Sequence, residues 1–240
     1  MNQPLPLIWL PGLLCDGGLF EDVNKGLPGW VAPSCIQLAT LSTMEQLAHD
    51  VLLQAPPEFV LGGLSMGGIL AFEVYRQAPE RVKGLILMDT NAADEKPEVT
   101  EKRNDLVSQA LSGQFAAITP EVLLPVLIHP SRLNNRVLTQ QIEQMAINVG
   151  VDAFSAHADA LANRPDSRPL LAQISVPTLV ITGKDDLLCP LDNHLLMAKH
   201  ISDVTLHVLP DCGHLSSMER PKDVAARLTD WFEINQHWWL

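Results

Sequence analysis

The chain has little positive charge for its length, and this shortage excludes several kinds of partner. Its 240 residues include 16 lysines and arginines against 28 aspartates and glutamates, which gives a formal net charge of −12. With no basic cluster, such a chain is a poor partner for nucleic acid or for an anionic membrane, and it mildly repels polyanionic substrates such as acyl-CoA. We therefore expect a neutral small-molecule substrate.

Cysteine pairs and metal-binding motifs are also missing. The four cysteines, at positions 15, 35, 189 and 212, form no C-x-x-C pair, so we expect reduced thiols rather than disulfides. No histidine pair has the H-E-x-x-H spacing of a zinc-binding helix. Apart from the histidine at 214, those at 49, 129, 157, 194, 200, 207 and 237 are interpreted as structural. The sequence therefore predicts no metal and no cofactor.

Long apolar runs are absent as well. No run of 18 consecutive apolar residues occurs. The first lysine is Lys25, so the N-terminus lacks the basic region of a signal peptide, and its short apolar run is better explained as a strand. We expect a cytoplasmic protein without nucleic-acid or membrane partners.

What the chain does contain is an alternation of strand-like and helix-like segments, typical of an α/β fold with a mostly parallel sheet and helices on both faces. The strand-like segments are 5–10, 34–39, 58–63, 82–88, 176–182 and 203–209, and the helix-like ones are 43–54, 68–77, 190–201 and 221–233. The alternation stops at about 92–165, where we expect short helices near 97–112, 120–128, 132–148 and 151–162. This pattern and the length predict one domain, 1–240, with a core of 1–91 and 166–240 and a helical cap inserted at 92–165.

The motif Gly63-Leu64-Ser65-Met66-Gly67 lies between an apolar run and a helix-like stretch, so Ser65 is expected at a strand-to-helix corner. Such a corner lifts a serine hydroxyl clear of the sheet, beside the amides that open the next helix. Glycine is needed on either side because a side chain there would collide with the neighbouring strand and helix. The pentapeptide by itself is common, and its strand-turn-helix context is what indicates a nucleophile.

A nucleophilic serine needs a base and an orienting acid, and at such a corner the acid and then the histidine follow it in the chain. Asp185 and Asp186 stand in the loop after the strand-like segment 176–182, and His214 stands in the loop after 203–209. Both loops leave the sheet at the edge that carries Ser65. Position along the chain leaves either aspartate open as the acid.

Together these motifs make the chain similar to the α/β-hydrolases over nearly all of its length, and to serine carboxylesterases in particular. Family members often have Gly-x-x-Asp with a proline four positions on, which here selects Asp186, so the resemblance implies Asp186 rather than Asp185 as the acid. They also tend to have Gly-His before the last helix and Glu-x-Pro soon after. Gly213-His214 and Glu219-Arg220-Pro221 fit that pattern.

An oxyanion hole needs two backbone donors aimed at the developing negative charge. The residue after the nucleophile supplies one of them, the Met66 amide. By resemblance to the family's His-Gly-x turn, the second donor is the Leu13 amide. The chain departs from that turn by having Pro11 in place of histidine, but the amide rather than the side chain binds the oxyanion, so we expect the hole to be kept.

The sequence thus predicts a serine hydrolase that cleaves neutral carboxylic esters of short to medium acyl chain through an acyl-enzyme. Ser65 is the nucleophile, His214 the base and Asp186 the acid. The motif around Ser65 does not distinguish esterases from carbon-carbon bond hydrolases, thioesterases, lactonases and perhydrolases of the same fold. A non-catalytic ligand receptor on this fold is the alternative from another class. Apolar cap residues are candidates for an acyl pocket: Phe115, Val122, Leu123, Val126, Leu127, Ile128, Met145 and Phe154.

Overall fold

The computed structural model describes residues 4–239 and has a six-stranded sheet at its centre. Neighbouring strands are parallel throughout, in the order β2-β1-β3-β4-β5-β6. The strands are β1 (Leu5–Leu10), β2 (Val31–Cys35), β3 (Phe59–Leu64), β4 (Val82–Met88), β5 (Thr178–Gly183) and β6 (Val204–Leu209). The prediction of an α/β fold with a parallel sheet is confirmed.

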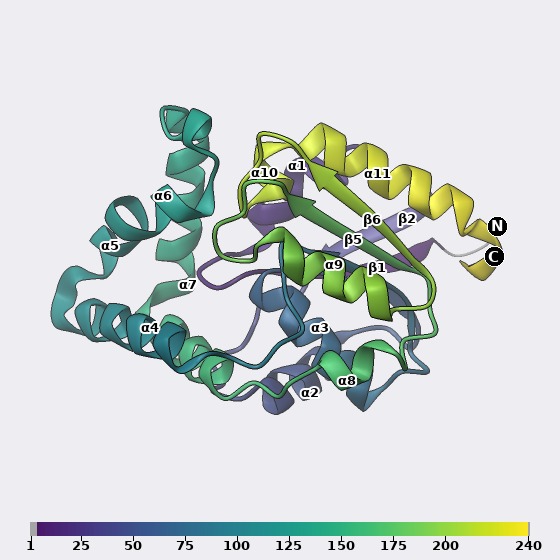
Figure 1. Cartoon of the computed structure of the whole chain (residues 1–240), viewed down its shortest axis with the longest axis horizontal. Helices are drawn as coiled ribbons and strands as arrows, with labels where there is room; N and C mark the ends of the chain where they lie inside the picture. Colours follow the sequence, from purple (N-terminus) through teal and green to yellow (C-terminus); the bar gives the residue numbers. More distant parts are fainter. Residues whose placement is uncertain (1–3, 240) are drawn as a thin grey trace.

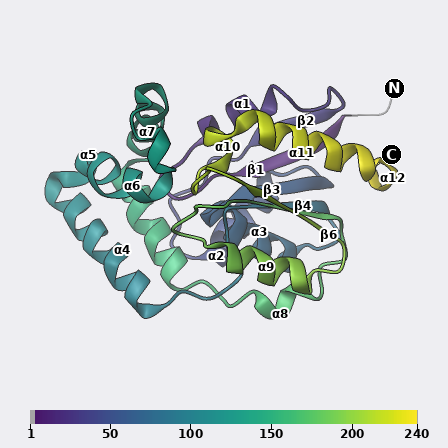
Figure 2. The same ribbon diagram turned by 45° about the horizontal axis from the view of Figure 1, so that its top comes forward.

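Helices cover both faces of this sheet (Figures 1 and 2). Every residue of β3 and β5 is buried, which explains why these strands are almost continuously apolar. One face packs against α2 (Met44–Gln54), α3 (Met66–Gln77), α8 (Arg168–Leu171) and α9 (Leu191–His200). The other packs against the turn Gly17–Phe20, α1 (Glu21–Asn24), α10 (Ser216–Glu219), α11 (Pro221–Ile234) and α12 (Gln236–Trp239). Parallel strands require such crossover helices, because a tight hairpin cannot join them.

The helix boundaries follow local signals in the sequence. Thr43 caps α2, because its hydroxyl accepts a hydrogen bond from Gln46 N at 3.2 Å. Pro221 is the first residue of α11, where its missing N–H costs nothing. Val224, Leu228 and Trp231, spaced four and then three residues apart along α11, are buried.

Strand β2 lies about three residues earlier than the predicted segment 34–39. The segment Val31–Cys35 includes Pro33, which lacks an N–H but is tolerated because β2 is an edge strand paired only with β1. Ile36 N still donates to the Trp9 carbonyl at 3.1 Å, and Ile36 and Leu38 are then buried in the core. The residues after Cys35 therefore form a loop that faces the core. Their apolar sequence resembles that of a strand, which explains the displaced prediction.

The cap lies between β4 and β5 in the chain and stands beyond one end of the sheet (Figures 1 and 2). Its helices are α4 (Pro97–Gln109), α5 (Phe115–Ile118), α6 (Leu124–Leu127) and α7 (Arg136–Ala162), joined by turns at Ala110–Gln114, Thr119–Leu123 and Pro130–Arg132. The two helices expected at 132–148 and 151–162 form the single element α7. It is bent at Gly150, whose φ of 81° departs from helical geometry.

The chain enters and leaves the cap at adjacent points, because Ser167 N donates to the Ala92 carbonyl at 2.8 Å. Next to this bond lies a buried cluster that we call the root clamp: the Glu95 carboxylate, 1% exposed, paired with Arg103 and Arg164. Burial acts to raise the pKa of Glu95, but the two guanidinium groups hold it below its usual value. The base of the cap is therefore fixed by buried, compensated charges.

One helical run in the cap, Pro97–Leu127, is long and apolar enough to cross a membrane by length and composition alone. The most apolar part of this run has a mean hydropathy of 1.3, and 22% of that part is buried. The run is not straight, because Gly113 has a φ of 95° and turns the chain after α4. A single run of this kind is a weak indication of a membrane span.

Candidate active site

Ser65 occupies the corner between β3 and α3. β3 ends at Leu64 and α3 begins at Met66, so Ser65 is the single residue between them. Its φ of 56° is strained for a residue with a side chain, and such strain costs about 1–3 kcal/mol and clusters at functional sites. The flanking glycines make room for the bend. A Cβ on Gly63 would lie 2.2 Å from the Gly67 carbonyl oxygen, and a Cβ on Gly67 would lie 2.0 Å from that of Leu10.

Residues at the end of β4 hold the Ser65 backbone in this bend. Ser65 N donates to the Met88 carbonyl at 2.9 Å, and Thr90 Oγ1 donates to the Ser65 carbonyl at 2.7 Å. Thr90 is held in turn, because its N–H donates to His194 Nε2 at 3.0 Å. Burial lowers the pKa of His194 to about 4, so its ring is neutral near pH 7 and able to accept this bond. No local pattern in the sequence marks Thr90, and His194 is among the histidines interpreted above as structural.

A hydrogen-bonded relay joins Ser65, His214 and Asp186. Ser65 Oγ lies 2.8 Å from His214 Nε2, and His214 Nδ1 lies 2.8 Å from Asp186 Oδ2. When Nδ1 carries the ring proton, it donates a hydrogen bond to the carboxylate. Nε2 then presents a lone pair that can accept the serine proton. His214 is 2% exposed and Asp186 is 5% exposed, so the bond between them is shielded from water, whereas the bond to Ser65 is partly buried.

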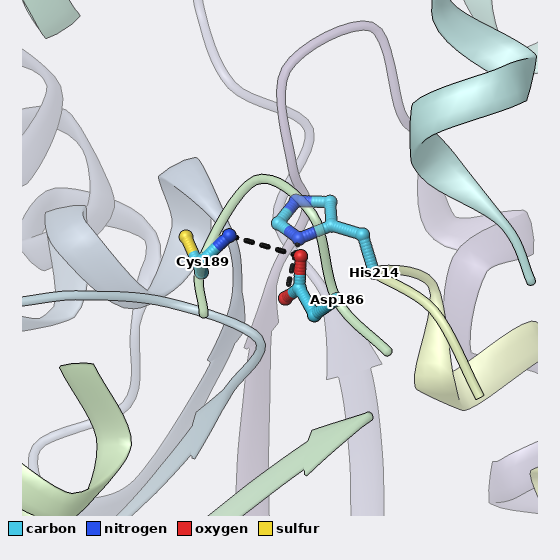
Figure 3. A group of neighbouring side chains, drawn as sticks. All are labelled: Asp186, Cys189 and His214. Carbon is cyan, nitrogen blue, oxygen red and sulfur yellow. Dashed lines mark hydrogen bonds and ion pairs between the residues drawn. The ribbon is translucent and has the colours of Figure 1, made fainter. Parts of the chain in front are cut away.

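Asp186 is the aspartate that faces the histidine. Its Oδ1 accepts hydrogen bonds from Leu188 N at 2.8 Å and Cys189 N at 2.9 Å, which leaves Oδ2 for His214 (Figure 3). The neighbouring carboxylate of Asp185 is 43% exposed and lies 3.9 Å from His129 Nε2. The structure therefore places the alternative acid outside the relay.

The electrostatics of the relay favour a charged histidine. Burial acts to lower the pKa of His214, but the Asp186 carboxylate, with smaller contributions from Asp89 and Glu219, more than offsets this. The pKa of His214 therefore lies above its usual value. Such an arrangement is suited to stabilising an imidazolium at this position.

Asp89 is a further buried carboxylate at the site that the sequence analysis did not identify. It ends β4 with a φ of 45° and is fully buried. Its Oδ1 accepts from Gly183 N at 2.9 Å, and its Oδ2 bonds to the backbone and hydroxyl of Ser216. Burial, reinforced by the Asp186 charge, raises the pKa of Asp89 to about 8. The available signal was a polar residue directly after an apolar strand beside the serine's strand.

The two amides predicted to form an oxyanion hole have no protein partner in the described part of the chain. Met66 is the first residue of α3, so its N–H has no acceptor within the helix. Leu13 N donates no hydrogen bond to residues 4–239. Leu14 beside it has a strained φ of 60°, and the loop is tied to the cap by Asn148 Nδ2, which donates to Asp16 Oδ2 at 2.8 Å. Both amides are free to bind a ligand oxygen.

Apolar cap residues pack against this loop. One cluster contains Leu13 and Leu14 together with cap residues Ala110, Phe115, Ile118, Leu123, Ala146 and Phe154. Of the predicted pocket residues, Met145 and Ile128 are buried with the core instead, and Val122 is 43% exposed. The cap therefore packs apolar side chains against Leu13.

Within residues 4–239, two groups of side chains have ligand atoms close enough to share a metal ion, within 4.8 Å of one another. One is Asp186, Cys189 and His214 (Figure 3). Two of its members are engaged in the relay, and burial raises the pKa of the Cys189 thiol, which disfavours the thiolate that metals bind. The other group is the more exposed set His129, Asp185 and Asp211, an arrangement common on protein surfaces.

The chain matches the family model for the alpha/beta hydrolase fold over residues 55–221. It is 29% identical to 3-oxoadipate enol-lactonase 2 of Acinetobacter baylyi over 185 residues, which cover 75% of the chain and 67% of that protein. It is 28% identical to a pimeloyl acyl-carrier-protein methyl ester esterase of Nitrosomonas europaea over 235 residues, 90% of the chain and 91% of that protein. Other curated relatives are matched over about half their length, 48% for a biotin biosynthesis bifunctional protein of Cellvibrio japonicus.

Among solved structures, the chain is similar to a thermophilic esterase from Thermogutta terrifontis. The two have a TM-score of 0.84 and 30% sequence identity, and the match covers 98% of this chain and 91% of the esterase. The similarity therefore extends over the sheet and the cap together.

Proposed function

Since the chain belongs to the α/β-hydrolase fold family, as its motifs predicted, we propose that it is a serine hydrolase that cleaves carboxylic esters through an acyl-enzyme. The observation that carries this proposal is the relay, with 2.8 Å from Ser65 Oγ to His214 Nε2 and 2.8 Å from His214 Nδ1 to Asp186 Oδ2. Two free amides beside the serine, those of Leu13 and Met66, supply the donors that a tetrahedral intermediate requires.

In the first half-reaction, Ser65 Oγ attacks the ester carbonyl carbon while His214 Nε2 takes the hydroxyl proton. The negative charge that develops on the carbonyl oxygen is bound by the two amides. Asp186 stabilises the imidazolium, which then protonates the leaving alcohol as the carbon-oxygen bond of the ester breaks. The acyl group remains on Ser65 as an ester.

The second half-reaction repeats these steps with water. His214, neutral again, takes a proton from a water molecule, and the resulting hydroxide attacks the acyl carbon. The imidazolium returns a proton to Ser65 Oγ as the acid leaves. No cofactor takes part in either half-reaction.

Two features favour neutral esters of short to medium acyl length. The cap cluster beside Leu13 is apolar, and burying a methylene there contributes about 0.8 kcal/mol at most. Two of the cap cations, Arg103 and Arg164, are paired with Glu95 and are therefore poor partners for an anionic substrate. The similarity to the Thermogutta esterase supports an ester as the substrate.

Lactone opening is a second candidate. A lactone is a cyclic ester, so the same two half-reactions open it, and the similarity to the Acinetobacter enol-lactonase favours this alternative. In that case the leaving alcohol stays attached to the acyl group.

A substrate panel tests the proposal. It contains p-nitrophenyl esters from acetate to palmitate, a γ-lactone, a thioester, a carbon-carbon hydrolase substrate, and a neutral and an anionic ester of equal length. Ser65→Ala should lower ester turnover by about 10³-fold or more. Ser217→Ala is the control for removal of a serine hydroxyl, because Ser217 is buried and its hydroxyl has no hydrogen-bond partner within the described residues. Absence of sustained turnover by wild-type protein would favour the receptor alternative, and faster cleavage of the anionic ester would contradict the apolar pocket.

A further inference from the structure

The end of α6 and the segment after it lie against the loop that carries His214. Both His214 N and Leu215 N donate to the Leu127 carbonyl, at 2.9 and 3.1 Å. Ile128 is extended, with φ −128° and ψ 155°, and runs beside Gly213. We call residues 127–129 the cap connector and residues 213–215 the histidine loop.

Glu219, the last residue of α10, forms hydrogen bonds with both segments. Its side chain is buried, its Oε1 accepts from Gly213 N at 2.9 Å, and its Oε2 accepts from His129 N at 2.8 Å. One carboxylate oxygen thus serves the histidine loop and the other serves the cap connector. Burial raises the pKa of Glu219, whereas the hydrogen bonds from the two backbone N–H groups act to lower it. In its ionised form the carboxylate accepts bonds that are stronger than those between neutral groups.

The fit between the two segments leaves little freedom. A Cβ on Gly213 would lie 2.7 Å from His129 N and 3.0 Å from Glu219 Oε1. Without Glu219, the buried N–H of Gly213 and the partly buried N–H of His129 would lose their acceptor, and the segments would be free to separate. His214 would then move relative to Ser65, and a displacement of about 1 Å at a reacting group costs on the order of 10²-fold in rate.

From this geometry we propose that Glu219 is a positioning residue that locks the cap connector to the histidine loop, so that His214 reaches Ser65 only while the cap is docked. The cap is then part of the support of the base as well as a cover over the substrate. The effect on rate rests on the proposed function, whereas the lock itself is a property of the fold.

The backbone at position 129 offers a specific test. His129 has φ −58° and ψ 140°, which proline adopts without strain, and the extended Ile128 is compatible with a following proline. His129→Pro removes the N–H that Glu219 accepts and places the ring against Oε2. His129→Ala keeps that N–H, so it is the matched control for loss of the imidazole. Glu219→Ala also removes one negative charge. Asp223→Ala removes a negative charge close by in the sequence and is the control for that effect.

We expect kcat for p-nitrophenyl butyrate to fall about 10- to 100-fold in His129→Pro, Glu219→Ala and Glu219→Gln, with KM within about threefold of wild type. His129→Ala and Asp223→Ala should stay within about threefold of wild type in kcat. His129→Pro combined with Glu219→Ala should be no slower than the slower single variant, because both remove the same contact. Additive losses, a change confined to KM, or equal rates for the proline and alanine variants would overturn the proposal.

Hydrogen–deuterium exchange separates this inference from the proposed function, because it needs no substrate. Amides of peptides that span 212–216 should exchange faster in His129→Pro and Glu219→Ala than in His129→Ala. Unchanged protection there would refute the lock even if ester turnover is observed. Faster exchange in a protein that hydrolyses no ester would support the lock and reject the esterase assignment alone.

Discussion

Replacement of Asp186 by asparagine tests the relay at its most sensitive point. The asparagine oxygen can still accept the hydrogen bonds from Leu188 N and Cys189 N, since these fix one end of the group at 2.8 and 2.9 Å. The amide NH₂ then faces His214 Nδ1 and can only donate. This reverses the bond, so Nδ1 must become the acceptor and the ring proton moves to Nε2, which faces Ser65.

A histidine with its proton on Nε2 cannot accept the serine proton. We expect Asp186→Asn to lower kcat/KM by roughly 10²- to 10⁴-fold, which corresponds to about 2.7–5.4 kcal/mol of transition-state stabilisation. The matched control is Asp185→Asn, one residue earlier in the same loop, whose carboxylate is 43% exposed and should cost less than about threefold. The measurement is steady-state hydrolysis of p-nitrophenyl butyrate with circular dichroism of each variant. If Asp185→Asn proves the more damaging change in folded protein, the assignment of the acid is wrong.

Three further outcomes follow from the structure. Because the pKa of His214 lies above its usual value and the proposed base is the neutral ring, kcat/KM should fall as the pH decreases through a value above about 6.5; a profile flat from pH 5 to 8 would exclude His214 as the base. Gly67→Ala should yield little soluble protein, because its Cβ would lie 2.0 Å from the Leu10 carbonyl oxygen, and normal expression and circular dichroism would contradict this. Glu95→Ala leaves two cations of the root clamp uncompensated and should destabilise the fold by about 3–5 kcal/mol in thermal denaturation, whereas Asp94→Ala, at a side chain 59% exposed, should have almost no effect.

Much of the fold was predictable because buried parallel strands have short, continuously apolar sequences. The segments at 5–10, 82–88 and 203–209 match β1, β4 and β6 closely. The displaced β2 shows the limit of this signal, since an apolar run such as Ile36 to Leu38 is equally compatible with core-facing loop. Its proline is tolerated only because the strand is at an edge, and strand order is not visible in local sequence.

The candidate site was predictable where the requirement is local. The bend at Ser65 needs small neighbours, so its glycines mark it in the sequence. The supporting residues were not predictable, because their partners are far apart along the chain: Thr90 is 25 residues from Ser65, and Glu219 is 90 residues from His129. Choosing Asp186 over Asp185 required the resemblance for the same reason, since both occupy one loop and only tertiary structure decides which of them faces His214.

The adjacent entry and exit of the cap have a consequence for how such a protein changes over evolution or by engineering. Because Ala92 and Ser167 are hydrogen-bonded to each other, everything between them can be lengthened, shortened or exchanged without moving the ends of β4 and β5. A transplanted cap would keep the buried ion pairs at its base only if Glu95, Arg103 and Arg164 are transferred together. The hydrogen bonds from His214 and Leu215 to Leu127 set a second condition: a new cap must present a carbonyl at that place, or the loop that carries His214 loses part of its support.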